Sequence, residues 1–443
     1  MIAQSRLSTT HSLGKLKVGT LLTNIILAVL ILVPSINYFG KCVLFNLAGI
    51  EITLRFLVLV SILGILAFSL IIGRMVTIPY QLVVSVFFVV WGTSVAIIQS
   101  VPLRWWLPPF MRWWGNILIA LLGYHLAYRG YLTPHRFRLG LMLALVIPIT
   151  FGVIQIALGI VPLLNGAYRV SSTFRDSPLG FALFLSGAGV MLLSAYPLRT
   201  IYKVLLAALV GMVVSTYARL TLVALGIGIV FLFYLQKRIR GVFLMVWLIL
   251  PLLFFPAVIE QLITRFSTLN LNSTVILDIW REAQTMAYQA RWWRSDVDSS
   301  FLLRVKTFVV GLNAFQEKPL QGHGFGSYVP YHEKVTGETN IAAHNDYILY
   351  LVETGIVGVV TYLILQAVIV VGLVRRSKSL SRETRFFAVS VATAYLVINV
   401  LSSLSNAYYF YEIQFWVWLG IGMSFALVNI DRQRHLLYNH PAT

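Results

Sequence analysis

Charged side chains are scarce in this sequence, making up only 11% of its 443 residues, whereas hydrophobic residues make up 58%. The mean hydropathy is +0.83, and apolar runs of about 18 residues or more, long enough to cross a bilayer, recur along the chain. No soluble domain of this size could bury so many of them. Cys42 is the only cysteine, which excludes an internal disulfide. The composition predicts an all-α polytopic membrane protein.

Acidic residues are also few, with 15 Asp and Glu against 34 Lys and Arg, for a formal net charge of +19. This excess does not indicate nucleic-acid binding, because more than half of the basic residues fall in segments on one side of the predicted helices. The positive-inside rule then places both termini in the cytoplasm. Basic residues on the outer side still outnumber the carboxylates there, which favours a polyanionic or phosphate-bearing ligand.

The apolar runs predict about 12 transmembrane helices, and tight joins between some of them leave ten or eleven as alternatives. The predicted spans are 19–39, 53–73, 77–99, 115–132, 139–161, 178–196, 201–217, 220–236, 242–259, 346–374, 386–403 and 412–429. A polar segment, residues 259–343, divides the chain. Residues 1–258 hold the first nine helices, and residues 344–443 hold the last three and a cytoplasmic tail. We expect residues 259–343 to form one large periplasmic loop with two amphipathic helices, near 275–294 and 299–315.

A titratable histidine stands where the polar segment meets the next apolar run, in the sequence His344-Asn345-Asp346. An imidazole at this boundary can take a proton from a polar acceptor held beside a lipid-borne donor. The nearby helix N-terminus would keep it neutral, as a general base requires. The alternative is a polar capping residue, although Asn345 or Asp346 makes the better N-cap. Glu353 lies about half a turn round the helix from His344 and is interpreted as a structural partner.

Arginine is the cation best suited to a phosphate ligand, because its fixed fork of donors matches phosphate oxygens. Arg219 lies between two apolar segments, where a guanidinium either snorkels or binds a ligand. Arg304 lies on the second predicted loop helix, where a solvated surface is the alternative. Further candidates for substrate contacts, for which a surface role is the alternative, are Arg169, Arg175, Lys306 and Lys318.

Other patterns favour structural roles. The glycine-rich run 322–326 follows no strand and lacks the Lys-Ser/Thr ending of a phosphate loop, so it is interpreted as a tight turn. Asp296 and Asp298 have the spacing of a metal-binding pair but no third ligand nearby, and we expect no metal. Arg-Trp-Trp recurs at 104–106, 112–114 and 291–293. These units are typical of an interfacial anchor, and a lateral rim that guides a lipid substrate is the alternative.

Three blocks of residues carry a resemblance to a known family. The first is the turn from Ser215 to Leu220, and the second runs from Arg304 through Pro319 to Gly326. The third is His344-Asn345 followed by Glu353 and Gly355. Together with the single large outer loop, their order resembles the O-antigen ligase and polymerase superfamily of bacterial envelope glycosyltransferases.

The resemblance implies a glycosyltransferase of the GT-C type in the bacterial inner membrane, with its active site on the periplasmic side. It implies a glycan donor on undecaprenyl diphosphate and no cofactor, nucleotide sugar or metal. His344 would activate the acceptor hydroxyl, Arg219 and Arg304 would bind the diphosphate, and Asn345 would contact substrate. The motif's structural residues would be Gly322, Gly324, Glu353 and Gly355. No carboxylate pair suited to a covalent intermediate is visible, so we expect inversion.

The resemblance leaves the acceptor open. Ligation of O-antigen to lipid A-core is the favoured reaction, and polymerisation of lipid-linked repeats is the alternative. Transfer to protein is disfavoured, because no added C-terminal domain is present. The rival from another class is a secondary transporter. Transporters usually show two similar halves with broken helices at matching positions, and this sequence shows no such symmetry.

Overall fold

The computed structural model describes most of the chain between residues 79 and 439. The described residues are 20–21, 23–32, 43–47, 50–53, 64, 79–161, 163–164, 167–168, 170–174, 177–195, 200–216, 218–236, 273–286, 299–405 and 411–439. The predicted span 242–259 lies outside them, as does nearly all of 53–73. The Asp296–Asp298 pair and the Arg-Trp-Trp unit at 291–293 also lie outside the described residues.

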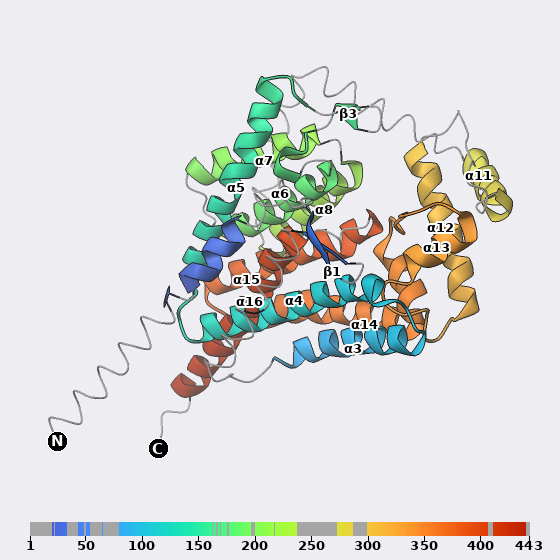
Figure 1. The fold of residues 1–443 in the computed structure, drawn as a ribbon. Coiled ribbons are helices and arrows are strands. Elements are labelled where there is room, and N and C mark those ends of the chain that lie inside the picture. The colour runs from blue at the N-terminus through green and yellow to red at the C-terminus, as the bar shows by residue number, and fades with distance from the viewer. Residues whose placement is uncertain are drawn as a thin grey trace.

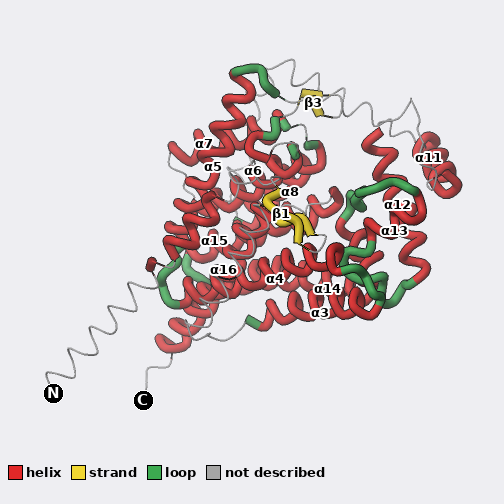
Figure 2. The backbone as a smooth tube through the Cα atoms, in the orientation of Figure 1, coloured by secondary structure: helices red, strands yellow, loops and turns green. Residues whose placement is uncertain are grey.

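Helices dominate the described chain (Figure 2). The helices in the apolar regions are α3 Tyr80–Ile98, α4 Leu103–Tyr128, α5 Pro134–Ala157, α6 Pro178–Leu192, α7 Thr200–Ser215, α8 Arg219–Leu235, α14 Asp346–Arg376, α15 Arg382–Tyr395 and α16 Tyr411–Asn439. The polar segment contributes α11 Ser273–Met286, α12 Ser299–Glu317 and α13 Tyr328–Thr336. Both helices expected there are therefore present. A π-helical segment, Leu396–Leu401, and a short helix η7, Ser402–Ser405, continue α15.

Among the described residues, two small antiparallel strand pairs depart from the all-α expectation. Strand β1, Val43–Leu47, pairs antiparallel with β2, Ile50–Thr53. Strand β3, Leu163–Leu164, pairs antiparallel with β4, Ala167–Tyr168. The first pair lies between the predicted spans 19–39 and 53–73 and shares only Thr53 with the second of them, and the other pair lies between 139–161 and 178–196.

Within the described part of the chain, five helices are long and apolar enough to cross a membrane: Gln81–Ile98, Pro134–Ala157, Asp346–Arg376, Arg382–Leu404 and Ile413–Gln433. Shorter apolar helices run over Thr23–Leu32, Pro178–Leu192, Val204–Ser215 and Leu220–Leu235. All of these coincide with predicted spans. The chain is thus a helical protein with several candidate membrane spans, whereas the total of about twelve and the GT-C type stay predictions.

Helix α4 begins much earlier than the predicted span 115–132 and includes the first two Arg-Trp-Trp units. Pro108 and Pro109 lie inside it, and each removes a backbone donor. Tertiary packing offsets that loss, because the Trp113 ring lies 4.9 Å from the ring of Phe88 on α3 and 6.1 Å from that of Tyr350 on α14. The helix containing the predicted span 115–132 therefore begins twelve residues earlier than the apolar run indicates.

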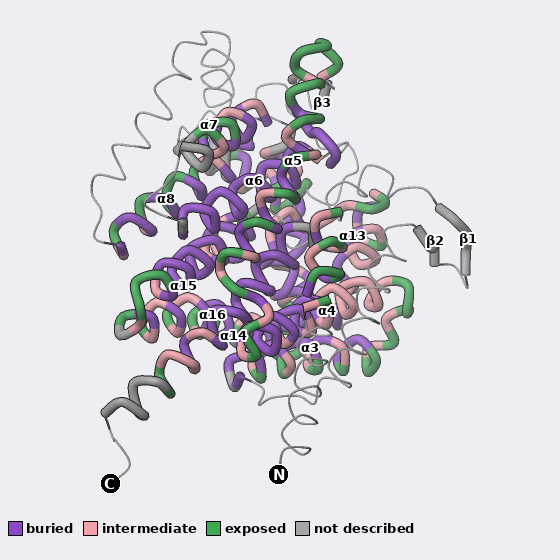
Figure 3. The backbone as a smooth tube through the Cα atoms, turned by 90° about the vertical axis from the view of Figure 1, so that its left-hand side faces the viewer, coloured by how far each residue is buried: buried purple, intermediate pink, exposed green. Residues whose placement is uncertain are grey.

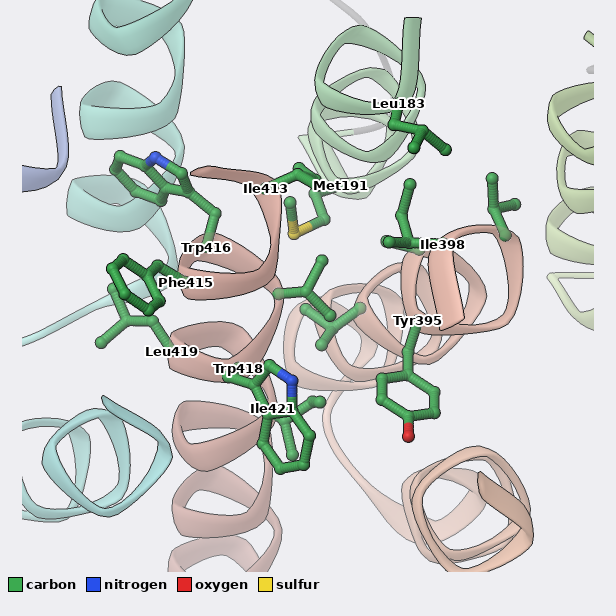
Figure 4. Close-up of a cluster of buried hydrophobic side chains, with 14 of the residues drawn as sticks. Leu183, Met191, Tyr395, Ile398, Ile413, Phe415, Trp416, Trp418, Leu419 and Ile421 are labelled. Atoms are coloured by element: carbon green, nitrogen blue, oxygen red, sulfur yellow. The ribbon is translucent and has the colours of Figure 1, made fainter. Parts of the chain in front are cut away.

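The core lies around α6, α15 and α16, where most side chains are buried on every side of the helix (Figure 3). A helix that is apolar all round belongs in the interior of a bundle. A Cβ atom on Gly187 of α6 would meet Ile413 of α16 and Ile398 of the π-helical segment. Figure 4 shows these two isoleucines and Met191 of α6 in the space between their helices, with the Trp416 ring on the other side of α16. The outer helices instead expose apolar side chains that suit a lipid environment, including Phe87 on α3, Val146 on α5 and Val360 on α14.

The bundle has two chemically different ends. At one end, an Arg138–Glu383 ion pair of 3.2 Å joins α5 to α15, and Arg385 donates to the Leu235 carbonyl at the end of α8. The connections after α4 and α14 lie at this end, and the basic residues in or beside them are Arg129, Arg136, Arg375, Arg376, Lys378 and Arg382. Helices α12 and α13 pack at the other end, against the beginning of α14 (Figure 1).

Candidate functional site

Arg304 and His344, forty residues apart in the sequence, lie close together in the structure. Arg304 is exposed on α12, and His344 is half-buried directly before α14. The guanidinium is near enough to act electrostatically on the imidazole. The Thr307 hydroxyl lies 3.0 Å from the carbonyl oxygens of both Arg304 and Ala343 and so joins the two segments.

The surroundings of His344 favour the neutral imidazole. Desolvation by burial lowers its pKa, and the positive charge of Arg304 lowers it further. Asn345 is the N-cap of α14, where its side-chain oxygen accepts from the backbone N–H of Tyr347 at 2.9 Å and of Ile348 at 3.2 Å. His344 therefore stands just outside the helix, half-exposed and able to accept a proton near pH 7.

Lys306 has a protein partner. Its ammonium lies 2.8 Å from the Glu338 carboxylate, and the lysine side chain is only 5% exposed. This ion pair joins α12 to the chain that follows α13. A phosphate ligand would have to compete with Glu338 for Lys306, whereas Arg304 on the same helix is exposed to solvent. Of these two cations on α12, Arg304 is the more exposed and Lys306 the more buried.

The glycine-rich run forms a turn that packs against α14. Gly322 and Gly324 have φ values of 74° and 94°. The N–H groups of His323 and Gly324 donate to the carbonyls of Val352 and Glu353 at 2.8 and 2.7 Å. A Cβ atom on Gly324 would lie 2.3 Å from the Ala96 Cα, so the glycine allows this turn to pack against α3. These N–H groups bind α14 and are not directed at a ligand.

Helix α14 is interrupted where this turn contacts it. Gly355 has φ 62° and ψ −167°, and the next residue, Ile356, donates its N–H to the Pro319 carbonyl at 2.9 Å. The buried Glu353 carboxylate accepts from the N–H groups of Gly326 and Tyr328, and Arg112 lies nearby. Glu353 thus joins α14 to the start of α13.

Lys318 lies at the edge of the same region. Its ammonium donates to the side-chain oxygen of Gln99, which directly follows α3. This contact ties the end of α12 to the end of α3. The described residues contain no group of three His, Cys, Asp or Glu side chains able to hold a metal ion.

Arg219 is the first residue of α8, and its side chain lies outside the described part of the structure, as do Arg169 and Arg175 entirely. The backbone still places it. The C-terminal end of α8 lies at the basic end, where Leu235 accepts from Arg385. Helix α8 also packs against the π-helical segment. In that segment the Val400 carbonyl accepts a hydrogen bond of 2.8 Å from the hydroxyl of Tyr347, at the beginning of α14. Arg219 therefore begins its helix at the same end of the bundle as His344.

Sequence reasoning missed two features of this region. The first is the contact of Thr307 and Tyr328 behind His344, for which a lone Thr and Tyr give no signal. The second is a buried polar network in which Gln366 and Gln414 donate to Asn399 at 2.7 and 2.8 Å. Amide side chains inside apolar spans are costly, so this signal was readable from the sequence.

Comparison with known proteins finds a match to a protein family. Residues 204–363 match the family model described as O-antigen ligase. The matched segment includes Arg219, Arg304, His344 and Gly355, and it confirms the resemblance to the O-antigen ligase and polymerase superfamily. No curated protein matches the chain.

Proposed function

We propose, from the O-antigen ligase match, that this protein is a membrane glycosyltransferase that moves a glycan from undecaprenyl diphosphate to an acceptor hydroxyl. The observation that carries the proposal is the juxtaposition of a half-buried His344, its pKa lowered, with the exposed Arg304. These are the two groups that such a transfer needs on opposite sides of the anomeric carbon. One accepts a proton and the other stabilises a departing phosphate.

In the proposed reaction, neutral His344 removes the proton from the acceptor hydroxyl as its oxygen attacks the anomeric carbon. The bond between that carbon and the diphosphate oxygen breaks, and the electron pair leaves with the lipid diphosphate. Arg304, with Arg219 as the second proposed cation, stabilises the charge that develops there. A single displacement inverts the anomeric configuration. The two guanidinium groups supply the positive charge, and the proposal includes no metal step.

We propose lipid A-core as the acceptor, with a second lipid-linked repeat as the outcome that would make the protein a polymerase. The proposed location is the bacterial inner membrane. The end of the bundle with α12 and α13 would face the periplasm, and the basic end would face the cytoplasm. The clustering of basic loops at one end supports this orientation.

The test uses the purified full chain with undecaprenyl-diphosphate-linked glycan and, separately, lipid A-core or a second lipid-linked repeat. His344→Ala should lower transfer by about a hundredfold or more, the range for loss of a general base. His135→Ala is the matched control, because His135 is exposed at the basic end. Longer lipid-linked chains without transfer to lipid A-core would identify a polymerase. No transfer by a folded wild-type protein would reject the proposal and return attention to protein acceptors and transport.

A further inference from the structure

His344 has an unfavourable backbone conformation. Its φ of 53° lies in the left-handed region, which a side chain with a Cβ rarely adopts. Asn345 follows with φ −158°, so the chain turns sharply immediately before α14. A non-glycine residue keeps such a conformation only when its surroundings hold it, and these positions cluster at functional sites. The contacts around His344 show what holds it.

Thr307 holds the residue before the histidine. Thr307 is fully buried on α12, and Ala343 is only 2% exposed. The threonine hydroxyl lies 3.0 Å from the Ala343 carbonyl oxygen and 3.0 Å from that of Arg304, one turn earlier on the same helix. One hydroxyl therefore contacts the backbone of Arg304 and the backbone of Ala343, the residue that precedes His344.

Tyr328 in turn holds Thr307. Its hydroxyl donates to the Thr307 carbonyl at 2.9 Å, and its side chain is fully buried at the beginning of α13. The backbone N–H of Tyr328 donates to the buried Glu353 carboxylate on α14. The contacts thus run from α14 through α13 and α12 back to Ala343, the residue before His344. A buried hydrogen-bonded chain of this kind restricts each of its members.

We infer that Thr307, supported by Tyr328, is a positioning residue that fixes His344 in its left-handed conformation beside Arg304. Thr307 does not touch the reacting atoms. Its hydroxyl sets the path of the backbone that presents the imidazole. The role for which His344 is positioned rests on the proposed function, whereas the conformation itself is independent of it.

The test compares Thr307→Val and Thr307→Ser in the purified full chain. Valine keeps the shape and removes the donor, whereas serine retains it. Thr393→Val is the matched control, because Thr393 is also fully buried and donates to its own helix at the Val389 carbonyl, 2.8 Å away, far from His344 in sequence. Should Thr307→Val fold poorly, Tyr328→Phe tests the same support, because it removes the hydroxyl that donates to the Thr307 carbonyl.

The first readout is independent of activity. Diethyl pyrocarbonate modifies neutral imidazole, so its rate of reaction at His344, followed by peptide mass spectrometry against pH, reports the protonation and exposure of that residue. The charged group that acts on His344 in the described structure is Arg304 of α12, while Lys306 and Glu338 pair with each other. In Thr307→Val, the midpoint of the pH dependence of labelling should move up toward the ordinary histidine pKa. The labelling rate on the high-pH plateau should also rise. Thr307→Ser and Thr393→Val should match the wild type, and Tyr328→Phe should shift in the same direction as Thr307→Val.

The second readout is transfer activity. Thr307→Val should lower kcat/KM about tenfold, near the factor for one buried hydrogen bond, and should move the acid limb of the pH profile upward. A uniform loss with an unmoved limb, together with labelling equal to Thr393→Val, would overturn the inference. If the wild type transfers no glycan while the labelling shift appears, the proposed function fails and the positioning role stands.

Discussion

At His344, burial and the Arg304 charge act in the same direction, and the sign of the pH dependence follows. Both lower the pKa of the imidazole, so the neutral base persists below the ordinary histidine pKa of about 6.5. We expect kcat/KM to stay level as the pH falls through 6.5 and to decline only at the lowered pKa. Arg304→Gln removes the positive charge and leaves the burial of His344 in place. The acid limb of its pH profile should therefore move up without reaching the ordinary histidine pKa. Weaker donor binding would lower kcat/KM in addition.

A pH series of initial transfer rates for the wild type and Arg304→Gln measures this shift. Lys334→Gln is the control, because it removes an exposed cation from neighbouring α13. An acid limb in Arg304→Gln that coincides with both the wild type and the control would show that Arg304 does not act on the base.

Lys306 offers a second test at the scale of single residues, because its ion pair with Glu338 predicts a structural role. Lys306→Met leaves a largely buried carboxylate without its cation, and Glu338→Gln leaves the lysine without its anion. The double variant should recover part of the loss, with a coupling of about 1–3 kcal/mol. Thermal unfolding in detergent measures the stability, and the KM for donor in all three variants should stay near the wild-type value. Additive losses together with a raised KM would instead assign Lys306 to donor binding.

At the scale of elements, the break in α14 depends on a glycine. A Cβ atom on Gly355 would lie 2.3 Å from the Leu320 carbonyl oxygen, and the positive φ adds strain. We expect Gly355→Ala to lower the unfolding free energy by about 2 kcal/mol or more. Gly372→Ala on the same helix is the matched control, because a Cβ there meets nothing within 4 Å. Alanine's better helix propensity should leave that variant equal or more stable by up to about 1 kcal/mol. Equal melting temperatures for the two variants would contradict the packing described here.

The first residue of a helix was predictable at two positions where a capping or proline signal precedes the apolar run. Helix α6 begins at Pro178 and α14 begins at Asp346, both as predicted, because a proline and an Asn-Asp cap mark those positions. The beginning of α4 was not predictable. The Pro108-Pro109 pair disfavours a helix, whereas ring contacts of Trp113 with Phe88 on α3 and Tyr350 on α14 support one. The break at Gly355 depends likewise on a turn supplied from residues 319–326.

At the scale of the whole molecule, the site was only partly predictable from sequence. The order of motifs singled out Arg304 and His344, and the structure brings them together. The partner of Lys306 is Glu338, 32 residues later, and the Thr307 hydroxyl contacts the backbone carbonyl of Ala343, 36 residues later; neither contact has a local signature in the sequence. The sequence also showed the excess of basic residues in alternate loops. The structure adds that the described basic connections, those after α4 and α14, lie at the end of the bundle opposite α12 and α13.

The two ends of the bundle predict which exposed residues face the periplasm and which face the cytoplasm. Lys334 on α13 and Lys378 after α14 are both exposed, and they lie at opposite ends of the bundle. In a Cys42→Ser background, a membrane-impermeant thiol reagent applied to spheroplasts should label Lys334→Cys and leave Lys378→Cys unmodified. Both should react after the membrane is opened, which controls for accessibility. Labelling of Lys378→Cys alone in intact spheroplasts would reverse the orientation and place His344 on the cytoplasmic side. A periplasmic acceptor could not then reach the base, so this single comparison bears on the reaction as well as on the topology.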